Sequence, residues 1–178
     1  MTALEHFFCS IFPAHNIFAA QSSIMTQHFV KQIQFEIWAN QKIAEAIESA
    51  NEPGERVFFL YSHILSANSI WLSRLTNTEV TTTLFKERTY AESKALMQEV
   101  AEKWNAYLTT LDEKELGRMI HFIFPFDGSK KKIAIADGIT HVFGHSNYHR
   151  GQIIALLKGK LEPLPLLAYV VFASEADD

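Results

Sequence analysis

The residues with the clearest potential for chemistry are histidines. Eight occur in the 178 residues, and His141, His145 and His149 repeat at every fourth position. On a helix, residues i and i+4 differ by about 40° in direction and about 6 Å in height, so two neighbouring imidazoles reach one metal ion. Three do not, because His141 and His149 lie about 12 Å apart along the axis. One pair must therefore be chosen.

The choice follows from the faces of the helix. With His145 as the reference direction, His149 lies at about +40° and Ile153 at about +80°, on the apolar side. His141 falls at about −40°, toward the edge of that side. His63 lies in the apolar stripe of another predicted helix and offers a third inward imidazole. The sequence therefore predicts a metal site formed by His63, His145 and His149.

A site of three histidines leaves coordination positions open, as catalytic zinc sites do, whereas structural zinc normally has four protein ligands. The paired histidines are separated by Ser146, Asn147 and Tyr148, so the glutamate of the peptidase motif His-Glu-x-x-His is missing. No Glu-x-x-His pair occurs in the chain, which excludes a di-iron carboxylate bundle. The alternative is that the histidines are core or surface residues with local hydrogen bonds.

Hydrophobic periodicity predicts the helices that must position these residues. Four long helices are expected at residues 26–50, 55–77, 90–111 and 137–158. Turn residues at 51–54 reverse the chain after the first, and Gly159 ends the last. A short helix is expected in the tail after Leu161.

Residues 118–135 follow a different pattern, because apolar residues alternate with others on both sides of Asp127-Gly128. The alternating residues before that turn are Ile120, Phe122, Phe124 and Phe126. This pattern predicts a β-hairpin. The fold class is therefore all-α: an antiparallel four-helix bundle, joined by short turns, with a small β-hairpin before the last long helix.

Length, composition and charge limit the functional classes to which this protein can belong. The length fits one domain, expected at residues 25–178, preceded by an N-terminal extension of unknown role at residues 1–24. A net charge of −4 supplies no basic field for nucleic acid. The single cysteine, Cys9, makes no intramolecular disulfide, and no apolar run is long enough to span a membrane. We therefore expect a cytoplasmic protein that binds neither nucleic acid nor membrane.

The last predicted helix resembles the C-terminal signature of the DinB family, a family of small metal-binding four-helix bundles. That signature here reads HVFGHSNYHRGQI, residues 141–153. Weaker resemblances lie at Trp38-Ala-Asn40, at residues 63–71 and at Asp127-Gly128, so the resemblance covers about residues 25–178. It implies a divalent metal ion on His63, His145 and His149, most often zinc or nickel, with manganese or iron as further options. It also implies a homodimer.

Four residues of the signature have roles that the sequence leaves open. Arg150 points about 140° away from His145, which predicts a partner on another helix or subunit. Gln152 faces inward, either to satisfy a buried group or to orient a ligand. Tyr148 is expected to be packed or interfacial rather than an acid of the pocket, and His141 to support the site or line its entrance. His121, on the predicted hairpin, is expected to be solvated.

Two functions compete at this stage. Relatives implied by the resemblance include bacillithiol S-transferases and mycothiol-dependent maleylpyruvate isomerases, in which the metal activates a low-molecular-weight thiol. The leading hypothesis is therefore a metalloenzyme that activates such a thiol, or water, and transfers it to a small electrophilic substrate. No catalytic acid or base is identified. The alternative is a non-catalytic, metal-binding stress-response or interaction protein that acts through its dimer surface.

Overall fold

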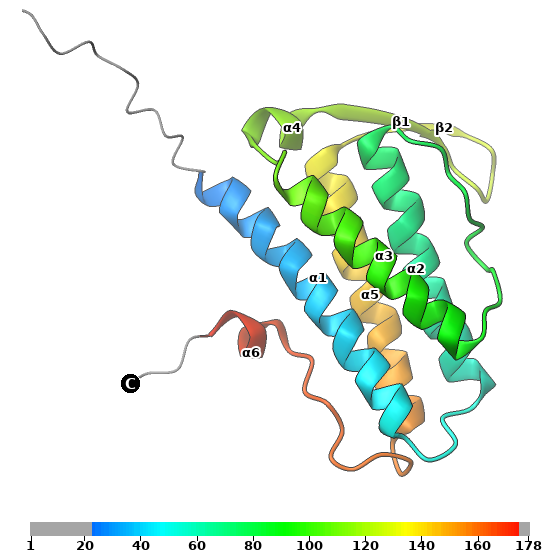
Figure 1. The fold of residues 1–178 in the computed structure, drawn as a ribbon. Coiled ribbons are helices and arrows are strands. Elements are labelled where there is room, and N and C mark those ends of the chain that lie inside the picture. The colour runs from blue at the N-terminus through cyan, green and yellow to red at the C-terminus, as the bar shows by residue number, and fades with distance from the viewer. Residues whose placement is uncertain (1–22, 175–178) are drawn as a thin grey trace, which may run out of the picture.

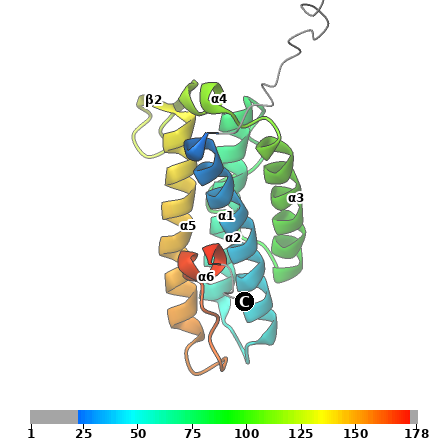
Figure 2. The same cartoon turned by 90° about the vertical axis from the view of Figure 1, so that its left-hand side faces the viewer.

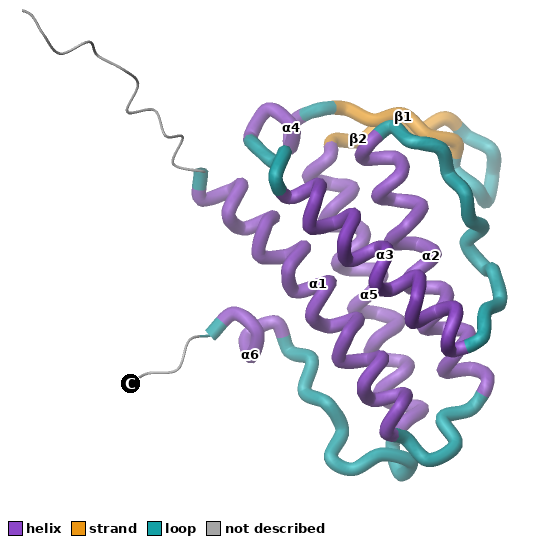
Figure 3. The backbone as a smooth tube through the Cα atoms, in the orientation of Figure 1, coloured by secondary structure: helices purple, strands orange, loops and turns teal. Residues whose placement is uncertain are grey.

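The computed structural model describes residues 23–174, shown in colour in Figure 1. The N-terminal extension predicted at residues 1–24 therefore lies almost entirely outside the described residues. Figure 3 shows that the described part is mainly helical, with one two-stranded sheet. The all-α bundle and its hairpin are confirmed. The elements are α1 (Ile24–Ser49), α2 (Glu55–Thr76), α3 (Tyr90–Leu108), α4 (Glu113–Gly117), β1 (Met119–Ile123), β2 (Lys130–Ala134), α5 (Ile135–Leu157) and α6 (Tyr169–Ala173).

The four long helices are not connected by short turns throughout. Helices α1 and α5 run in one direction and α2 and α3 in the other, so the consecutive helices α2 and α3 are parallel (Figure 1). Residues 77–89 connect them by running back along the bundle. An extended segment of this length spans about 40 Å, which is long enough for that path. This connection, which the sequence did not predict, brings a loop alongside the middle of α2.

Local sequence explains most of the helix ends. Ser23 caps α1, and Thr89 forms a reciprocal capping box with Glu92 at the start of α3. Helix α3 ends three residues earlier than predicted, because Asp112 caps the separate short helix α4. Gly159 has a φ of 77°, as expected for the residue that ends the last long helix.

The hairpin is shorter than predicted, because its turn is longer. Ile120 pairs with Ile133, and the register ends at Ile123 opposite Lys130. Phe124 and Phe126, which were expected to continue the first strand, lie in the turn instead. Their rings pack against each other there, with centroids 5.3 Å apart. Residues two positions apart thus lie on the same side of this turn, as they would in a strand, so the alternating pattern did not distinguish the two.

A polar layer divides the core of the bundle into two apolar clusters. One cluster lies toward the hairpin and includes Leu75 and Trp104, and the other lies toward the opposite end and includes Leu60 and Ile153. Buried polar side chains of α1, α2 and α5 occupy the positions in the sequence between these clusters. The histidines of the predicted metal site lie beside one another on α2 and α5, near this polar layer.

The tail beyond α5 folds back and ends in α6, which confirms the short helix predicted there. Figure 2 shows α6 lying against α1 and α5. Its Phe172 contacts the rings of Phe35 and Trp38, and Tyr169 contacts Phe143 of α5. None of the described helices is long and apolar enough to cross a membrane.

Candidate metal centre

The structure brings together the three histidines that the sequence selected. His63 comes from α2, and His145 and His149 come from the antiparallel helix α5. One ring nitrogen of each lies within 4.8 Å of the others, and the two Nε2 atoms of His63 and His145 are 3.1 Å apart. His63 is only 6% exposed, whereas the other two histidines are partly buried. The three imidazoles therefore converge at a point that solvent reaches from one side.

Two of these imidazoles are held by hydrogen bonds at the nitrogen that faces away from the cluster. The Nδ1 of His63 donates to the carbonyl oxygen of Leu84 at 3.0 Å. The Nδ1 of His149 donates to Oε1 of Gln152 at 2.8 Å. A ring that donates through Nδ1 keeps its lone pair on Nε2 while it is neutral. The protein thus fixes both the orientation and the tautomer that a metal ligand needs.

Electrostatics favour the neutral forms of His63 and His145. Burial, together with the neighbouring His149, His63 and His141, lowers the pKa of His145 to about 3. Burial also lowers the pKa of His63, an effect that the Leu84 carbonyl opposes and that His149 and Arg56 reinforce. Within the described residues, no carboxylate belongs to the cluster. A set of imidazole nitrogens without a carboxylate fits zinc, nickel or iron better than magnesium or calcium.

Comparison with known proteins agrees with this geometry. The sequence profile of the DinB family matches residues 18–160, a range that contains all three histidines. This chain belongs to the DinB family. Protein DinB of Bacillus subtilis (strain 168) is 28% identical over 156 residues, which cover 75% of this chain and 87% of that protein. No solved structure gives a significant match.

The connection at residues 77–89 contributes to the candidate centre in this member of the DinB family, a role that sequence patterns did not predict. Leu84, whose carbonyl orients the histidine on α2, lies in this loop. Arg88 fastens the loop to α2 by donating to Oγ of Ser62 at 2.9 Å and to Oγ of Ser66 at 2.7 Å. A long-range bond to a main-chain carbonyl leaves no pattern in side-chain types, so sequence reasoning missed it.

Aromatic rings surround the histidines on the side of this loop. The rings of Phe59 and Phe85 lie parallel to that of His63, with interplanar angles of 3° for each. The Phe85 ring is the nearer, with a centroid distance of 5.1 Å, and the side chain of Phe85 is 56% exposed. The imidazole of His63 is therefore shielded by the half-buried ring of Phe59 and the exposed ring of Phe85.

The remaining predicted residues divide between the edge of the site and solvent. His141 lies outside the ligand group, but its ring stacks on His145 and contacts Trp71, so it lines the site as expected. Tyr148 is 66% exposed, with its ring against that of His149, and is not packed in the core of this chain. His121 is exposed on β1, as predicted.

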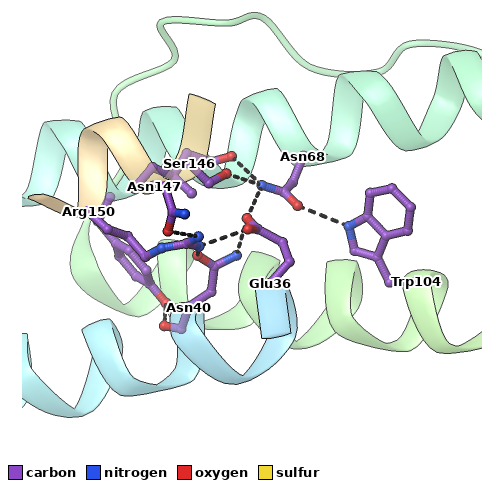
Figure 4. Close-up of polar contacts among 9 residues, drawn as sticks. Glu36, Asn40, Asn68, Trp104, Ser146, Asn147 and Arg150 are labelled. Atoms are coloured by element: carbon purple, nitrogen blue, oxygen red, sulfur yellow. Dashed lines mark hydrogen bonds and ion pairs between the residues drawn. The ribbon is translucent and has the colours of Figure 1, made fainter. Parts of the chain in front are cut away.

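Arg150 faces the opposite side of α5, where it confirms the prediction of a partner on another helix. It is 1% exposed and donates to Oε2 of Glu36 and to Oδ1 of Asn40, both at 2.9 Å. It also donates to Oδ1 of Asn147 at 3.0 Å. Figure 4 shows this guanidinium surrounded by its acceptors.

Asn68 of α2 extends the same polar layer to all four long helices. Its Nδ2 donates to Oε1 of Glu36 at 2.9 Å and to Oγ of Ser146 at 3.2 Å. Its Oδ1 accepts from Nε1 of Trp104 at 3.0 Å, as Figure 4 shows. Sequence reasoning did not identify Glu36 or Asn68, although a charged residue within the apolar stripe of a helix was a usable signal. The layer fixes the relative positions of the two helices that carry the histidines.

Proposed function

We propose that this protein binds one divalent metal ion through His63, His145 and His149 and uses it to activate a low-molecular-weight thiol for transfer to an electrophile. Zinc and nickel are the first candidates, with manganese and iron as alternatives. The observation that carries the proposal is the convergence of three imidazole nitrogens, without a carboxylate in the cluster among the described residues. Membership of the DinB family supports it.

The metal supplies open coordination positions and lowers the pKa of a thiol or water that binds there. The chain supplies the orientation of the ligands. Leu84 holds His63, and Gln152 holds His149. Exposed side chains at Phe85 and Tyr148 leave one side of the cluster accessible to a small molecule. The protein's own part is thus to hold three oriented imidazoles beside an exposed aromatic surface.

A thiol suits this site better than water. Water is a far weaker acid than a thiol, so a metal ion would have to lower its pKa much further, and no Asp or Glu belongs to the cluster within the described residues to assist proton removal. A free thiol has a pKa of about 8.5, so only a small reduction makes it a thiolate at neutral pH. Thiol transfer is therefore the favoured reaction, and hydrolysis is the alternative outcome of the assay.

A second candidate is a non-catalytic metal-binding protein that acts in a stress response or through a protein partner. It is favoured by the exposed apolar side chains of the C-terminal segment, where Leu166 is 69% exposed and Val170 is 68% exposed. Such side chains suit an interface, including that of a homodimer in the cytoplasm. In this case the metal would stabilise the bundle without exchanging small ligands.

The test begins with elemental analysis of untagged protein purified without a nickel column, beside His145→Ala. A matched control is His121→Ala, which removes an exposed histidine from the hairpin. We expect about one metal ion per chain in the wild type and in the control, and loss in His145→Ala. The loaded proteins are then assayed with several thiols and the electrophile 1-chloro-2,4-dinitrobenzene. Absence of metal after loading contradicts the site, and metal without turnover of any thiol supports the second candidate.

A further inference from the structure

Three side chains of α2 line up beside the metal centre. Arg56, Phe59 and His63 follow one another at spacings of three and four residues, which places them on one face of the helix. Arg56 lies seven residues before His63, so the two are separated by about 10 Å along the axis. This face therefore presents a cation, a phenyl ring and a candidate metal ligand in that order.

Phe85 completes this strip from the connection at residues 77–89. Its ring is parallel to that of Phe59, with an interplanar angle of 1° and centroids 6.5 Å apart. The guanidinium carbon of Arg56 lies 5.2 Å from the centroid of Phe59. Arg56 and Phe85 are exposed and Phe59 is half-buried, so the strip is open to solvent at the parts away from His63. An exposed aromatic surface that leads to a metal centre suits the apolar body of a ligand.

The charge of Arg56 is not neutralised by a neighbouring acid. Arg118 and Arg150 each form an ion pair with a glutamate, whereas no carboxylate of the described residues lies within 4 Å of the Arg56 guanidinium. Stacking on a phenyl ring leaves the edge of the planar guanidinium free to donate to an anion in a bidentate manner. The strip thus ends in an available site for an anionic group.

We infer that Arg56, Phe59 and Phe85 bind the part of the substrate that does not react, and that this part is an apolar or aromatic body with an anionic group at its far end. The inference rests on the proposed function, which places the reacting end at the histidines. The anionic group lies about 10 Å from the reacting end, the distance that separates Arg56 from His63 along α2. Small thiols without such a body are poor ligands by this criterion.

Arg74 provides a matched control on the same helix. Its guanidinium also contacts aromatic rings, 4.8 Å from the centroid of Trp71 and 4.5 Å from that of Phe122. No carboxylate of the described chain forms an ion pair with it either, but it lies on the other side of His63, toward the hairpin. Arg74→Gln therefore removes the same charge from a similar setting without touching the strip.

The experiment compares two probes that differ only in charge. They are 3-(4-sulfanylphenyl)propanoic acid and its carboxamide, each with a thiol at one end and a phenyl ring in the middle. Their dissociation constants are measured on cobalt-loaded protein from the change in visible absorption, and cobalt affinity is measured first for every variant. We expect the wild type to bind the acid about fivefold more tightly than the amide, as for an exposed ion pair. The preference should decrease with added salt.

The variants test the contributions of the anionic group and of the aromatic body of the ligand separately. Arg56→Gln should abolish the preference for the acid, Arg56→Lys should keep part of it, and Arg74→Gln should keep it in full. Phe85→Ala should weaken both probes by about threefold to tenfold, because it removes aromatic contact with the shared ring. Equal affinity for acid and amide on cobalt-loaded wild type, or a preference that survives Arg56→Gln, overturns this inference and leaves the proposed function standing. Failure to bind cobalt overturns both.

Discussion

His149 and Arg150 are adjacent in sequence, yet they belong to two polar regions of opposite character. The guanidinium of Arg150 is buried and donates to three acceptors, among them its counter-charge on Glu36. The imidazole of His149 has one nitrogen satisfied by Gln152, and its other nitrogen faces the convergent nitrogens of two further histidines. Adjacent helical residues point about 100° apart, which lets one helix serve both regions.

The difference between the regions separates structure from function. Buried polar groups are stable when each has a partner, and the Glu36–Arg150 layer comes close to that condition by linking the four long helices, with Nε of Arg150 as its exception. In the histidine cluster, the convergent nitrogens share one hydrogen bond, between the Nε2 atoms of His63 and His145. A cation bound between the three rings would take up the lone pairs of all three nitrogens. The first region holds the helices in place, and the second is where a cation has a reason to bind.

The largest expected effect comes from breaking the satisfied region. Arg150→Met leaves the carboxylate of Glu36 buried without its counter-charge and should lower the free energy of unfolding by about 3–5 kcal/mol. Urea unfolding of the metal-free protein at pH 7 measures this loss. The double variant Glu36→Gln with Arg150→Met removes both charges and should recover most of it. A loss below about 1 kcal/mol in the single variant would show that the layer is not essential to the fold.

The second expected effect falls on the metal centre alone. Gln152→Leu removes the acceptor that orients His149 and should weaken metal binding by about 10- to 100-fold. Competition with a chromogenic chelator measures the affinity. Gln152 is only partly buried, so the stability of the metal-free variant should stay close to that of the wild type. Gln152→Glu, which keeps an acceptor at the same place, should retain most of the affinity, and equal losses in the two variants would rule out the orienting role.

The same comparison explains which features the sequence revealed. The histidine trio could be predicted because the angular positions of residues on a regular helix follow from spacing alone, and His145 and His149 share such a helix. Gln152 was placed inward by the same reasoning. The bundle itself followed from apolar periodicity, which dominates wherever a helix buries one face.

Features that depend on the path of a loop could not be predicted in this way. The sequence does not show that residues 77–89 return along α2, so neither Leu84 nor Arg88 could be connected with His63. Phe124 and Phe126 illustrate the opposite error, in which a strand was predicted where there is a turn. Their alternation with other residues belongs to a turn in which the two rings are in contact. Spacing predicts faces of regular elements, but it does not predict which loop lies against them.

The third prediction tests that loop. Arg88→Ala releases the connection from Ser62 and Ser66, so the Leu84 carbonyl is held less firmly against His63. We expect metal affinity to fall by about threefold to tenfold, the value of one or two hydrogen bonds acting at a distance. The matched control is Arg118→Ala, which breaks an ion pair with Glu115 near the hairpin. If both variants lose affinity equally, the loss reflects general destabilisation and not the orientation of His63.

The smallest expected effect is a pH dependence that originates in the histidine cluster of the metal-free protein. Burial holds the pKa of His145 at about 3 in the folded state, whereas an exposed histidine in the unfolded chain has a pKa of about 6.5. Between these values the unfolded chain binds a proton that the folded chain does not, so the free energy of unfolding must fall as pH decreases below about 6.5. Urea midpoints measured from pH 7.5 to 5.5 should show this decline.

The decline should be smaller in His145→Gln, with the remainder due to His63 and His141, whose pKa values burial also lowers. It should be unchanged in His121→Gln, which alters an exposed histidine of the hairpin. An equal decline in both variants would mean that the cluster is not the source of the pH dependence, and that its imidazoles accept protons in the folded state as readily as in water.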